Sequence, residues 1–468
     1  MSKGTGTFSI GAPLKNRLIM SSSFTAELST IAAEIQGIAQ NIPDPTIAQG
    51  ITTDSRSIQV GELFVALRGE NFDGHDYVAM AIGQGARAAI VDGEFDAGDL
   101  PVIVVADTLK AYQSIGRWWR RKFSIPVIAI TGSVGKTTTK ELIAAMLSNY
   151  GKVLKTQANF NNEIGVPKTL LELRSDHDFA VVEMGMRGAG QIAELTLIAE
   201  PTIGLICTVG TAHIELLGSR EAIANAKCEL FAEMPKDSIA ILNADNALLV
   251  ETARKFWSGK TLSYGFTNGD IKGTYQSELL AGGVTIGDQS FPLPIPGEHN
   301  AINYLGALTV AAALGLDWAP FEQGLSVDLP GGRAKRYELA GDVVLLDETY
   351  NAGLESMLAA LTLLSQTAGK RRIAVLGTMK ELGDYSIEFH ELVGDRVQAL
   401  QFDQLLVLAD PPEADALISH ARSVPAERFE SHEQVIARLK EILKPGDRVL
   451  FKASRSVALD RVVNALRE

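Results

Sequence analysis

One short segment of this sequence has residue types and spacing suited to holding phosphate groups. An apolar run at residues 126–130 leads into Thr131-Gly132-Ser133-Val134-Gly135-Lys136-Thr137-Thr138. Glycines let backbone N–H groups converge on an anion, the lysine can reach outer phosphates, and the next hydroxyl can ligate Mg²⁺. A helical pattern follows at 137–147, and a helix N-terminus attracts anions. The segment therefore predicts a phosphate-binding loop with an accompanying Mg²⁺.

The loop is shorter than the general phosphate-loop pattern. That pattern has four residues between its first glycine and the Gly-Lys-Thr/Ser, but here the first-glycine position is held by Ile130 and Gly132 lies only three residues before Gly135. The alternative is an ordinary strand-to-helix turn. The β-rich run before the loop and the one-sided apolar pattern after it, with Leu142 and Met146, are the context that the motif requires.

Composition excludes several classes of protein. A chain of 468 residues is too long for one core and predicts two to four domains. The net charge of -13 argues against a nucleic-acid-binding protein, because phosphate backbones are bound by basic surfaces. No apolar run is long enough to span a membrane, and two cysteines, Cys207 and Cys228, indicate reduced thiols in the cytoplasm. Residues 1–20 lack a secretory signal and are expected to be a disordered lead-in, with Met20 as an alternative start.

Strands alternate with helical patterns almost throughout, which predicts parallel sheets covered by helices. Apolar strands are expected at 343–346, 373–376, 405–408 and 448–452, with helices such as 354–365 and 433–443 between them. This pattern is typical of a doubly wound domain. The predicted domains are a small α/β domain at 21–122, a central parallel-sheet domain at 123–331 and a Rossmann-like domain at 332–468, with a linker at 328–332. The basic, aromatic run at 118–122 is interpreted as an amphipathic helix end without a function.

Further polar residues stand at expected strand ends or in helices. Glu183 follows the strand 179–182, at the sheet edge where a Mg²⁺ ligand would lie, and His213 follows the strand 203–209. Lys227 lies in a helix expected at 222–234. Taken singly, each has an ordinary interpretation, as a salt-bridged glutamate, a structural histidine and a surface lysine.

Together these segments resemble the Mur ligase family, whose loop has the shorter spacing seen here. The resemblance runs from about residue 50 to the C-terminus. It is carried by Thr53-Asp54-Ser55-Arg56, Gly61-Glu62-Leu63-Phe64, Asn71-Phe72-Asp73-Gly74-His75-Asp76, Asn161-Asn162-Glu163-Ile164-Gly165-Val166-Pro167, Glu183-Met184-Gly185-Met186, Ala212-His213-Ile214-Glu215, Asn243-Ala244-Asp245, His299-Asn300, Gly332-Arg333, Asp347-Glu348-Thr349-Tyr350-Asn351-Ala352, Glu381-Leu382-Gly383 and Lys452-Ala453-Ser454-Arg455-Ser456.

The resemblance implies roles for individual residues. Those implied to contact ATP are Thr131, Gly132, Ser133, Val134, Gly135, Lys136, Thr137, Thr138, His299, Asn300, Asn303, Arg333 and Asp347. Those implied to hold Mg²⁺ are Thr137, Glu183, His213 and Lys227, the last as a carbamate; with Lys136, the last three form the implied catalytic set. Those implied to bind the UDP-linked and peptide substrates are Thr53, Asp54, Ser55, Arg56, Asn71, Phe72, Asp73, Gly74, His75, Asn351, Lys452, Ser454 and Arg455.

Within the family, the match implies a cytoplasmic, monomeric enzyme of peptidoglycan precursor synthesis. It would use ATP to join D-alanyl-D-alanine to UDP-N-acetylmuramoyl-tripeptide through an acyl phosphate. One alternative is a sibling that adds the third amino acid to the dipeptide substrate. It is disfavoured because Tyr350-Asn351-Ala352 replaces its Ala-His pair and its Asn-Pro-Arg segment is absent. The other alternative is a non-catalytic nucleotide switch, which the intact implied catalytic residues disfavour.

Overall fold

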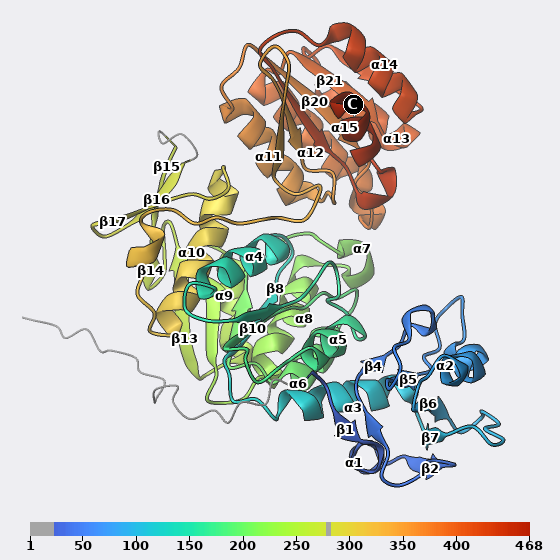
Figure 1. Ribbon diagram of the computed structural model, residues 1–468. Coiled ribbons are helices and arrows are strands. Elements are labelled where there is room, and N and C mark those ends of the chain that lie inside the picture. The colour runs from blue at the N-terminus through green and yellow to red at the C-terminus, as the bar shows by residue number, and fades with distance from the viewer. Residues whose placement is uncertain (1–22, 278–281) are drawn as a thin grey trace, which may run out of the picture.

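The computed structural model describes residues 23–277 and 282–468, which form three successive α/β domains (Figure 1). In the N-terminal domain, sheet β2-β7-β6-β5-β4 is parallel except for β2. Its elements, with 3-10 helices written η, are β1 (Ala26–Glu27), α1 (Leu28–Glu34), β2 (Ile38–Gln40), β3 (Ile47–Ala48), β4 (Ile51–Thr52), η1 (Ser55–Ser57), β5 (Leu63–Val65), η2 (Gly74–Tyr77), α2 (Val78–Gly83), β6 (Ala88–Asp92), β7 (Val102–Val105) and α3 (Thr108–Arg120).

The central domain is built on a parallel sheet in the order β14-β13-β12-β11-β8-β10-β9. Its elements are β8 (Val127–Thr131), α4 (Lys136–Leu147), β9 (Val153–Lys155), α5 (Gly165–Leu171), β10 (Phe179–Glu183), α6 (Gln191–Ala199), β11 (Ile203–Ile206), α7 (Ile214–Leu217), α8 (Arg220–Glu233), β12 (Ile239–Asn243), α9 (Ala247–Phe256), β13 (Lys260–Gly265), β14 (Ile271–Lys272), β15 (Thr274–Gln276), β16 (Gly283–Ile286), β17 (Gln289–Pro292), α10 (Glu298–Ala313) and η3 (Ala319–Phe321).

Alternation along β8 explains why helices cover both faces of this sheet. Ile128 and Ile130 pack with α4 and α10, whereas Val127 and Ala129 pack in the core that includes α5, α6 and α8. Successive side chains of a strand point to opposite faces, so a strand buried on both sides is apolar throughout. The antiparallel strands β15, β16 and β17 are an addition that the strand-helix alternation did not predict.

The C-terminal domain has the sheet order β18-β19-β23-β20-β21-β22, parallel except for the edge strand β18. Its elements are β18 (Lys335–Leu339), β19 (Val343–Asp347), α11 (Leu354–Gln366), β20 (Arg371–Gly377), η4 (Gly383–Tyr385), α12 (Ser386–Leu400), β21 (Gln404–Leu408), α13 (Pro411–His420), β22 (Ala426–Arg428), α14 (His432–Ile442), β23 (Asp447–Lys452), η5 (Arg455–Val457) and α15 (Asp460–Arg467).

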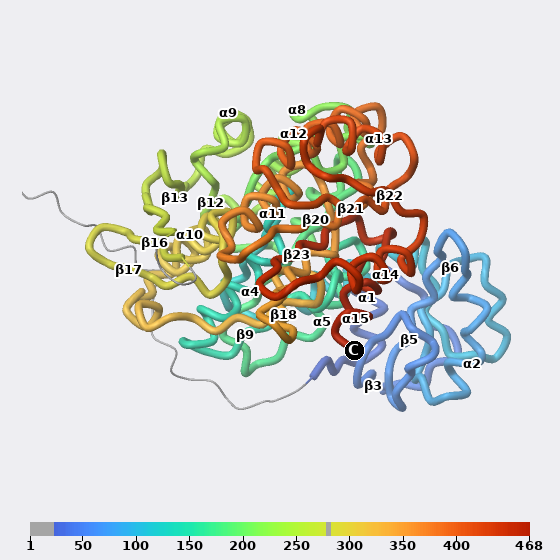
Figure 2. Tube along the Cα trace, turned by 90° about the horizontal axis from the view of Figure 1, so that it is seen from above, coloured from blue at the N-terminus to red at the C-terminus, as the bar shows by residue number. Residues whose placement is uncertain are grey.

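The predicted fold class is confirmed, while the domain boundaries remain predictions. The four expected C-terminal strands correspond to β19, β20, β21 and β23. Seen from above, the C-terminal domain overlies the central domain and the N-terminal domain projects to one side (Figure 2). The lead-in expected at residues 1–20 lies outside the described residues. No helix in the described parts of the chain is long and apolar enough to cross a membrane.

The run at 118–122 does more than end a helix, which is all that the sequence predicted. In Figure 1, α3 extends from the N-terminal domain along the central domain, and it packs against α5 and α6. The Trp119 indole donates to the carbonyl of Leu173 at 3.1 Å, and the Arg120 guanidinium donates to the carbonyls of Ala199 and Glu200 at 3.0 and 3.1 Å. The run therefore anchors α3 on the central domain.

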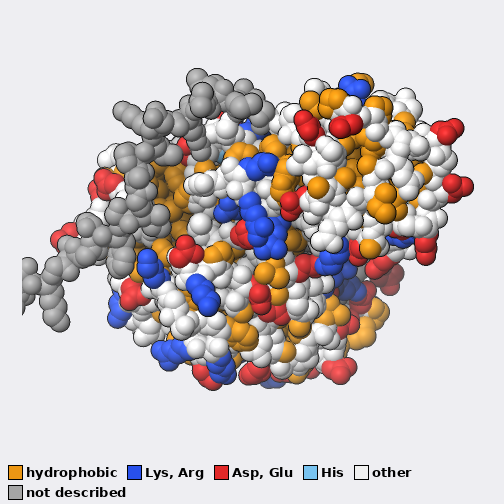
Figure 3. All heavy atoms as spheres, turned by 90° about the horizontal axis from the view of Figure 1, so that it is seen from below, with side chains coloured by type: hydrophobic (Ala, Val, Ile, Leu, Met, Phe, Trp, Pro, Cys, Tyr) orange, Lys and Arg blue, Asp and Glu red, His pale blue; other side chains and the backbone are white. Residues whose placement is uncertain are grey.

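Acidic and basic side chains both lie on the face of the molecule seen from below, and several Lys and Arg side chains gather near its middle (Figure 3). The net charge of the whole chain is -13.

Candidate active site

The phosphate loop lies between the buried strand β8 and the N-terminus of α4, as the sequence predicts. Gly135 has φ +88°, a left-handed conformation that favours glycine, and a Cβ there would lie 2.5 Å from Asn303 Oδ1. The Lys136 ammonium donates to the carbonyl of Gly132 at 2.8 Å, so it is folded back over the loop. Burial lowers the pKa of Lys136, and the nearby Glu183 carboxylate opposes that shift.

Glu183 ends β10, next to β8 in the sheet, and lies with its side chain 3% exposed. Its Oε1 accepts a hydrogen bond from Asn161 Nδ2 at 2.8 Å. Its Oε2 has no hydrogen-bond partner and lies 3.7 Å from the ammonium of the buried Lys140. A buried carboxylate oxygen at this sheet edge that has a long ion pair but no hydrogen bond fits a cation such as Mg²⁺.

His213 lies in the loop after β11, and its Nδ1 lies 2.8 Å from Glu381 Oε2 of the C-terminal domain. The hydrogen bond with His213 lowers the pKa of Glu381. The strand expected at 203–209 already ends at Ile206, because the chain then bends around Ser133, whose amide donates to the carbonyl of Thr208 at 2.9 Å. Within residues 23–277 and 282–468, no three His, Cys, Asp or Glu side chains form a ready metal cluster.

Lys227 is buried in α8 rather than exposed on its surface. The residue is only 1% exposed to solvent. Burial, reinforced by the Lys136 ammonium, lowers the pKa of Lys227 well below that of an ordinary lysine. A buried lysine without its proton is a neutral amine, which is the nucleophilic form of this side chain.

The C-terminal domain contributes a second group of side chains. The Arg333 guanidinium lies over the Tyr350 ring, with Cζ 3.7 Å from the ring centroid. Lys452 Nζ donates to the carbonyl of Asn351 at 3.0 Å and lies 3.9 Å from Glu348 Oε2. Burial lowers the pKa of Lys452 and raises that of Glu348, so burial weakens the charged form of both.

A cavity of about 440 Å³ brings the central and C-terminal residues together. The predicted site residues that line it are Ser133, Val134, Gly135, Lys136, Thr137, Thr138, Glu183, His213, His299, Asn300, Asn303, Arg333, Asn351 and Lys452. Burial, with a contribution from Lys452, lowers the pKa of His299 to about 4, so its imidazole is neutral at pH 7. The predicted phosphate loop with Lys136 therefore lines one part of the cavity, and Arg333 and Lys452 of the C-terminal domain line another part.

Comparisons with known proteins identify the family. A model described as the Mur ligase middle domain matches residues 130–311, one described as the Mur ligase, glutamate ligase domain matches 332–455, and one described as the Mur ligase family, catalytic domain matches 48–114. The chain belongs to the Mur ligase family.

Similar proteins cover almost the full length of this Mur ligase. A UDP-N-acetylmuramoyl-tripeptide–D-alanyl-D-alanine ligase from Synechocystis is 57% identical over 429 residues, which are 91% of this chain and 93% of the relative. A crystal structure of MurF from Acinetobacter baumannii has a TM-score of 0.87 and 31% identity, and covers 95% of this chain and 99% of its own. MurF from Thermotoga maritima in complex with ADP has a TM-score of 0.80 and 30% identity, and covers 89% and 96%.

Some of the site residues predicted for this Mur ligase lie outside the cavity. In the central and C-terminal domains these are Thr131, Gly132, Lys227, Asp347, Ser454 and Arg455. The Asp347 carboxylate accepts from the amide and hydroxyl of Thr349 at 3.1 and 2.6 Å, which holds it inside the C-terminal domain. Ser454 binds backbone groups of Lys380 and Ala352, and the Arg455 side chain is 64% exposed.

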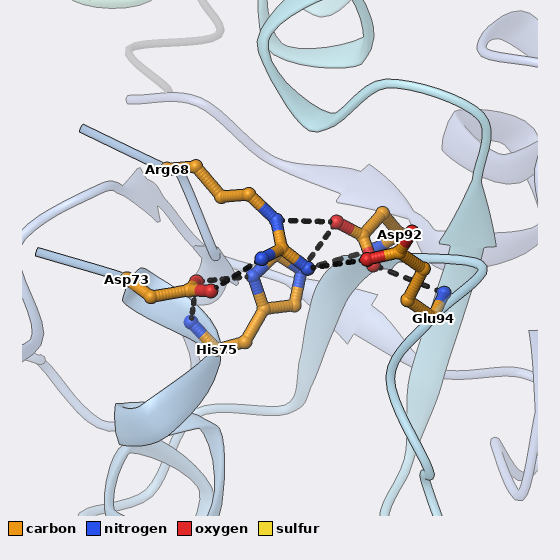
Figure 4. A network of polar contacts seen from close by, with 5 residues as sticks. All are labelled: Arg68, Asp73, His75, Asp92 and Glu94. Carbon is orange, nitrogen blue, oxygen red and sulfur yellow. Dashed lines mark hydrogen bonds and ion pairs between the residues drawn. The ribbon is translucent and has the colours of Figure 1, made fainter. Parts of the chain in front are cut away.

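The two predicted UDP-binding loops of the Mur ligase lie in the N-terminal domain. They follow β4 and β5, which are parallel neighbours, so both loops leave the same edge of the sheet. In the first loop, Asp54 accepts from the Arg56 amide and guanidinium. In the second, the buried His75 is held by Asp73 at 2.6 Å and accepts from the Asp92 amide at 3.0 Å (Figure 4). Arg68 donates to both aspartates and so braces the second loop.

Sequence reasoning assigned no role to several residues that line the Mur ligase cavity, and four of them make contacts that bear on the site. They are Asn161, Tyr350, Glu355 and Glu381. Three of them lie in segments that carry the family resemblance, so their place in those segments was an available signal. Glu355 lies outside those segments, and nothing in the local sequence distinguishes it from an ordinary helix-start glutamate.

Proposed function

We propose that this protein joins the amine of D-alanyl-D-alanine to the terminal carboxyl of UDP-N-acetylmuramoyl-tripeptide. ATP would be consumed, and UDP-N-acetylmuramoyl-pentapeptide, ADP and phosphate would be released. The observation that carries the proposal is that Lys136 of the phosphate loop and Arg333 of the C-terminal domain line the same cavity. Full-length similarity to ligases of this name supports the same reaction.

The chemistry has two steps. The substrate carboxylate attacks the γ-phosphorus of ATP and ADP leaves, which gives an acyl phosphate. The dipeptide amine then attacks the acyl carbon, phosphate leaves, and the amine gives up a proton to a base. Phosphoryl transfer depends mainly on positioning and on neutralising charge. Lys136 and Arg333 would supply positive charge from opposite domains.

Other residues would bind rather than react. Asn300 and Asn303, both buried at the start of α10, and the neutral imidazole of His299 would line the adenine. Thr349 holds Oδ1 of Asp347 through both of its hydrogen bonds, so Asp347 would reach the ribose with Oδ2.

The metal site is proposed from side chains that fit it. The Thr137 hydroxyl, Glu183 and His213 line the same cavity, and Glu183 Oε2 has no hydrogen-bond partner. When bound there, Mg²⁺ would neutralise phosphate charge. Burial lowers the pKa of Lys227, which favours its neutral amine, and a carbamate formed from that amine and carbon dioxide would present an anion on the phosphate-loop side.

The substrates would enter from different domains. The UDP group would bind the loops Thr53–Arg56 and Asn71–His75 with their bracing network, while Asn351, Lys452, Ser454 and Arg455 would face the peptides. We propose that the protein acts in the cytoplasm, because that is where ATP and UDP-linked substrates are available.

The decisive experiment is mass spectrometry of the product. The protein is supplied with ATP, D-alanyl-D-alanine and a UDP-N-acetylmuramoyl-tripeptide whose third residue is either meso-diaminopimelate or lysine. The expected product is the pentapeptide, with one phosphate released for each. A product formed only from the dipeptide substrate and a free amino acid would identify the sibling activity instead. ATP binding without any product would identify a nucleotide switch.

A further inference from the structure

Glu355 joins the C-terminal domain to the central domain through a pair of hydrogen bonds. It lies in the first turn of α11, and its carboxylate oxygens accept from the amide of Thr211 at 2.7 Å and from the Thr211 hydroxyl at 3.0 Å. Thr211, in the loop after β11, is only 6% exposed. Hydrogen bonds to an ionised carboxylate are stronger than neutral ones, and a two-pronged contact also restricts orientation.

The Thr211 loop is itself bonded to the phosphate loop. The Gly210 amide donates to Ser133 Oγ at 2.9 Å, and the Ser133 amide donates to the carbonyl of Thr208 at 2.9 Å. Glu355 also packs closely against Gly210 of this loop. A Cβ at Gly210 would lie only 2.5 Å from Glu355 Oε1, so the contact requires a residue without a side chain. Hydrogen bonds therefore connect the phosphate loop continuously to α11.

The other end of this connection leads to Arg333. Tyr350, which carries the Arg333 guanidinium on its ring, lies in the segment that enters α11. The Tyr350 amide also donates to the carbonyl of Gly332 at 2.9 Å. The placement of α11 relative to the phosphate loop thus also places Arg333 relative to Lys136.

We propose that Glu355 is a positioning residue for the ligation reaction. By binding Thr211, it fixes the C-terminal domain on the phosphate-loop side, so that Arg333 faces the nucleotide held by Lys136. This proposal rests on the proposed ligase function. The ion pair of His213 with Glu381 crosses the same domain boundary, but it uses a side chain that we assign to the metal. Glu355 instead binds the amide and hydroxyl of Thr211, a residue that has no proposed role in binding ATP, metal or substrate.

The connection predicts that removing Glu355 weakens the contact between the C-terminal and central domains and leaves each domain folded. Hydrogen bonds to charged groups are worth enough to change an equilibrium by roughly ten- to a hundred-fold. We expect Glu355→Ala to lower kcat for ligation by roughly that factor, with the Kd for ADP and the melting temperature unchanged. Small-angle scattering with nucleotide and UDP-substrate should show less compaction than in the unmodified protein.

A double-mutant cycle separates positioning from a general structural effect. Thr211→Val keeps the backbone donor and removes the hydroxyl, so it should lower kcat less than Glu355→Ala. Thr211→Ser should restore the rate. The double variant should be no slower than Glu355→Ala alone, because residues that share one contact are not additive. Glu388→Ala is the matched control, since Glu388 is exposed in the first turn of α12 in the same domain.

The outcomes are distinct. If the unmodified protein forms no pentapeptide, the proposed function fails and the variants are irrelevant to it. If the unmodified protein ligates and Glu355→Ala ligates equally fast or faster, the positioning role is wrong. Additive losses in the double variant, or a rate loss matched by a fall in melting temperature, would likewise overturn it.

Discussion

Asn161 Nδ2 donates a hydrogen bond to Glu183 Oε1 at 2.8 Å, and the other oxygen of this carboxylate, Oε2, is buried without a hydrogen-bond partner. Asn161 thus holds one oxygen of Glu183, and both residues line the cavity. The close approach depends on Gly185, where a Cβ would lie 2.8 Å from Asn161 Oδ1.

Asn161→Ala should therefore weaken the response to Mg²⁺. Residues that orient a metal ligand typically change metal affinity by about ten- to a hundred-fold, and we expect the Mg²⁺ concentration for half-maximal phosphate release to rise by that factor. Asn159→Ala, in the exposed part of the same loop, should leave it unchanged. An unaltered Mg²⁺ requirement in Asn161→Ala would show that Glu183 is oriented by other contacts or is not a ligand.

Lys136→Ala should abolish ligation. The variant loses a charge at the outer phosphates in a site built on charge neutralisation, and removing one such group costs on the order of hundreds-fold in rate. Phosphate release at saturating ATP is the measurement. Lys255→Ala, exposed on α9, serves as the control. Near-normal phosphate release by Lys136→Ala would refute its assignment to ATP.

Lys227 should make activity depend on pH and on dissolved carbon dioxide. Only the neutral amine forms a carbamate, and burial lowers the pKa of Lys227 below the reference of about 10.4. The neutral fraction is therefore present at a lower pH than for an exposed lysine, and it falls as the pH drops through the lowered pKa. Activity should fall in the same direction and recover with added bicarbonate, and ¹³C NMR with labelled bicarbonate should show a carbamate signal.

Substitutions of Lys227 test the same group without a pH change. Lys227→Ala should be nearly inactive and partly restored by acetate, which can occupy the vacated anion position. Lys227→Arg should be inactive with or without acetate, because a guanidinium forms no carbamate and fills the space. Lys236→Ala, exposed just after α8, should behave as the unmodified protein. Ligation at the full rate by Lys227→Arg would exclude the carbamate.

Arg120→Ala should destabilise the protein without slowing the chemistry. The guanidinium is buried and donates to the carbonyls of Ala199, Phe123 and Glu200 at 3.0, 2.8 and 3.1 Å. Leaving such acceptors unpaired costs about 1–3 kcal/mol each when they stay dry, so we expect a loss of about 3 kcal/mol. Chemical denaturation measures it, and Lys236→Ala, exposed just after α8, is the control. Unchanged stability would mean that α3 is anchored mainly by Trp119.

The sequence by itself determined the α/β class of the domains and the nature of the chemistry. The phosphate loop at Gly132–Thr137, Glu183 at a strand end and the C-terminal strand-helix alternation are recognisable because residue periodicity and turn chemistry are properties of neighbouring residues. The short antiparallel strands β15, β16 and β17 were not predicted, because no helix separates them and the strand-helix alternation is therefore missing there.

Only the tertiary structure decided which of these residues meet. It buried Lys227 near Lys136, enclosed Asp347 with Thr349 instead of leaving it in the cavity, and set Glu355 against Thr211, which is 144 residues away in the chain. The basic run at Arg120 became an anchor between domains in the same way. Local sequence patterns specify which face of an element is buried. Contacts between domains depend on how elements far apart in the chain pack against each other, and patterns among neighbouring residues do not specify this packing.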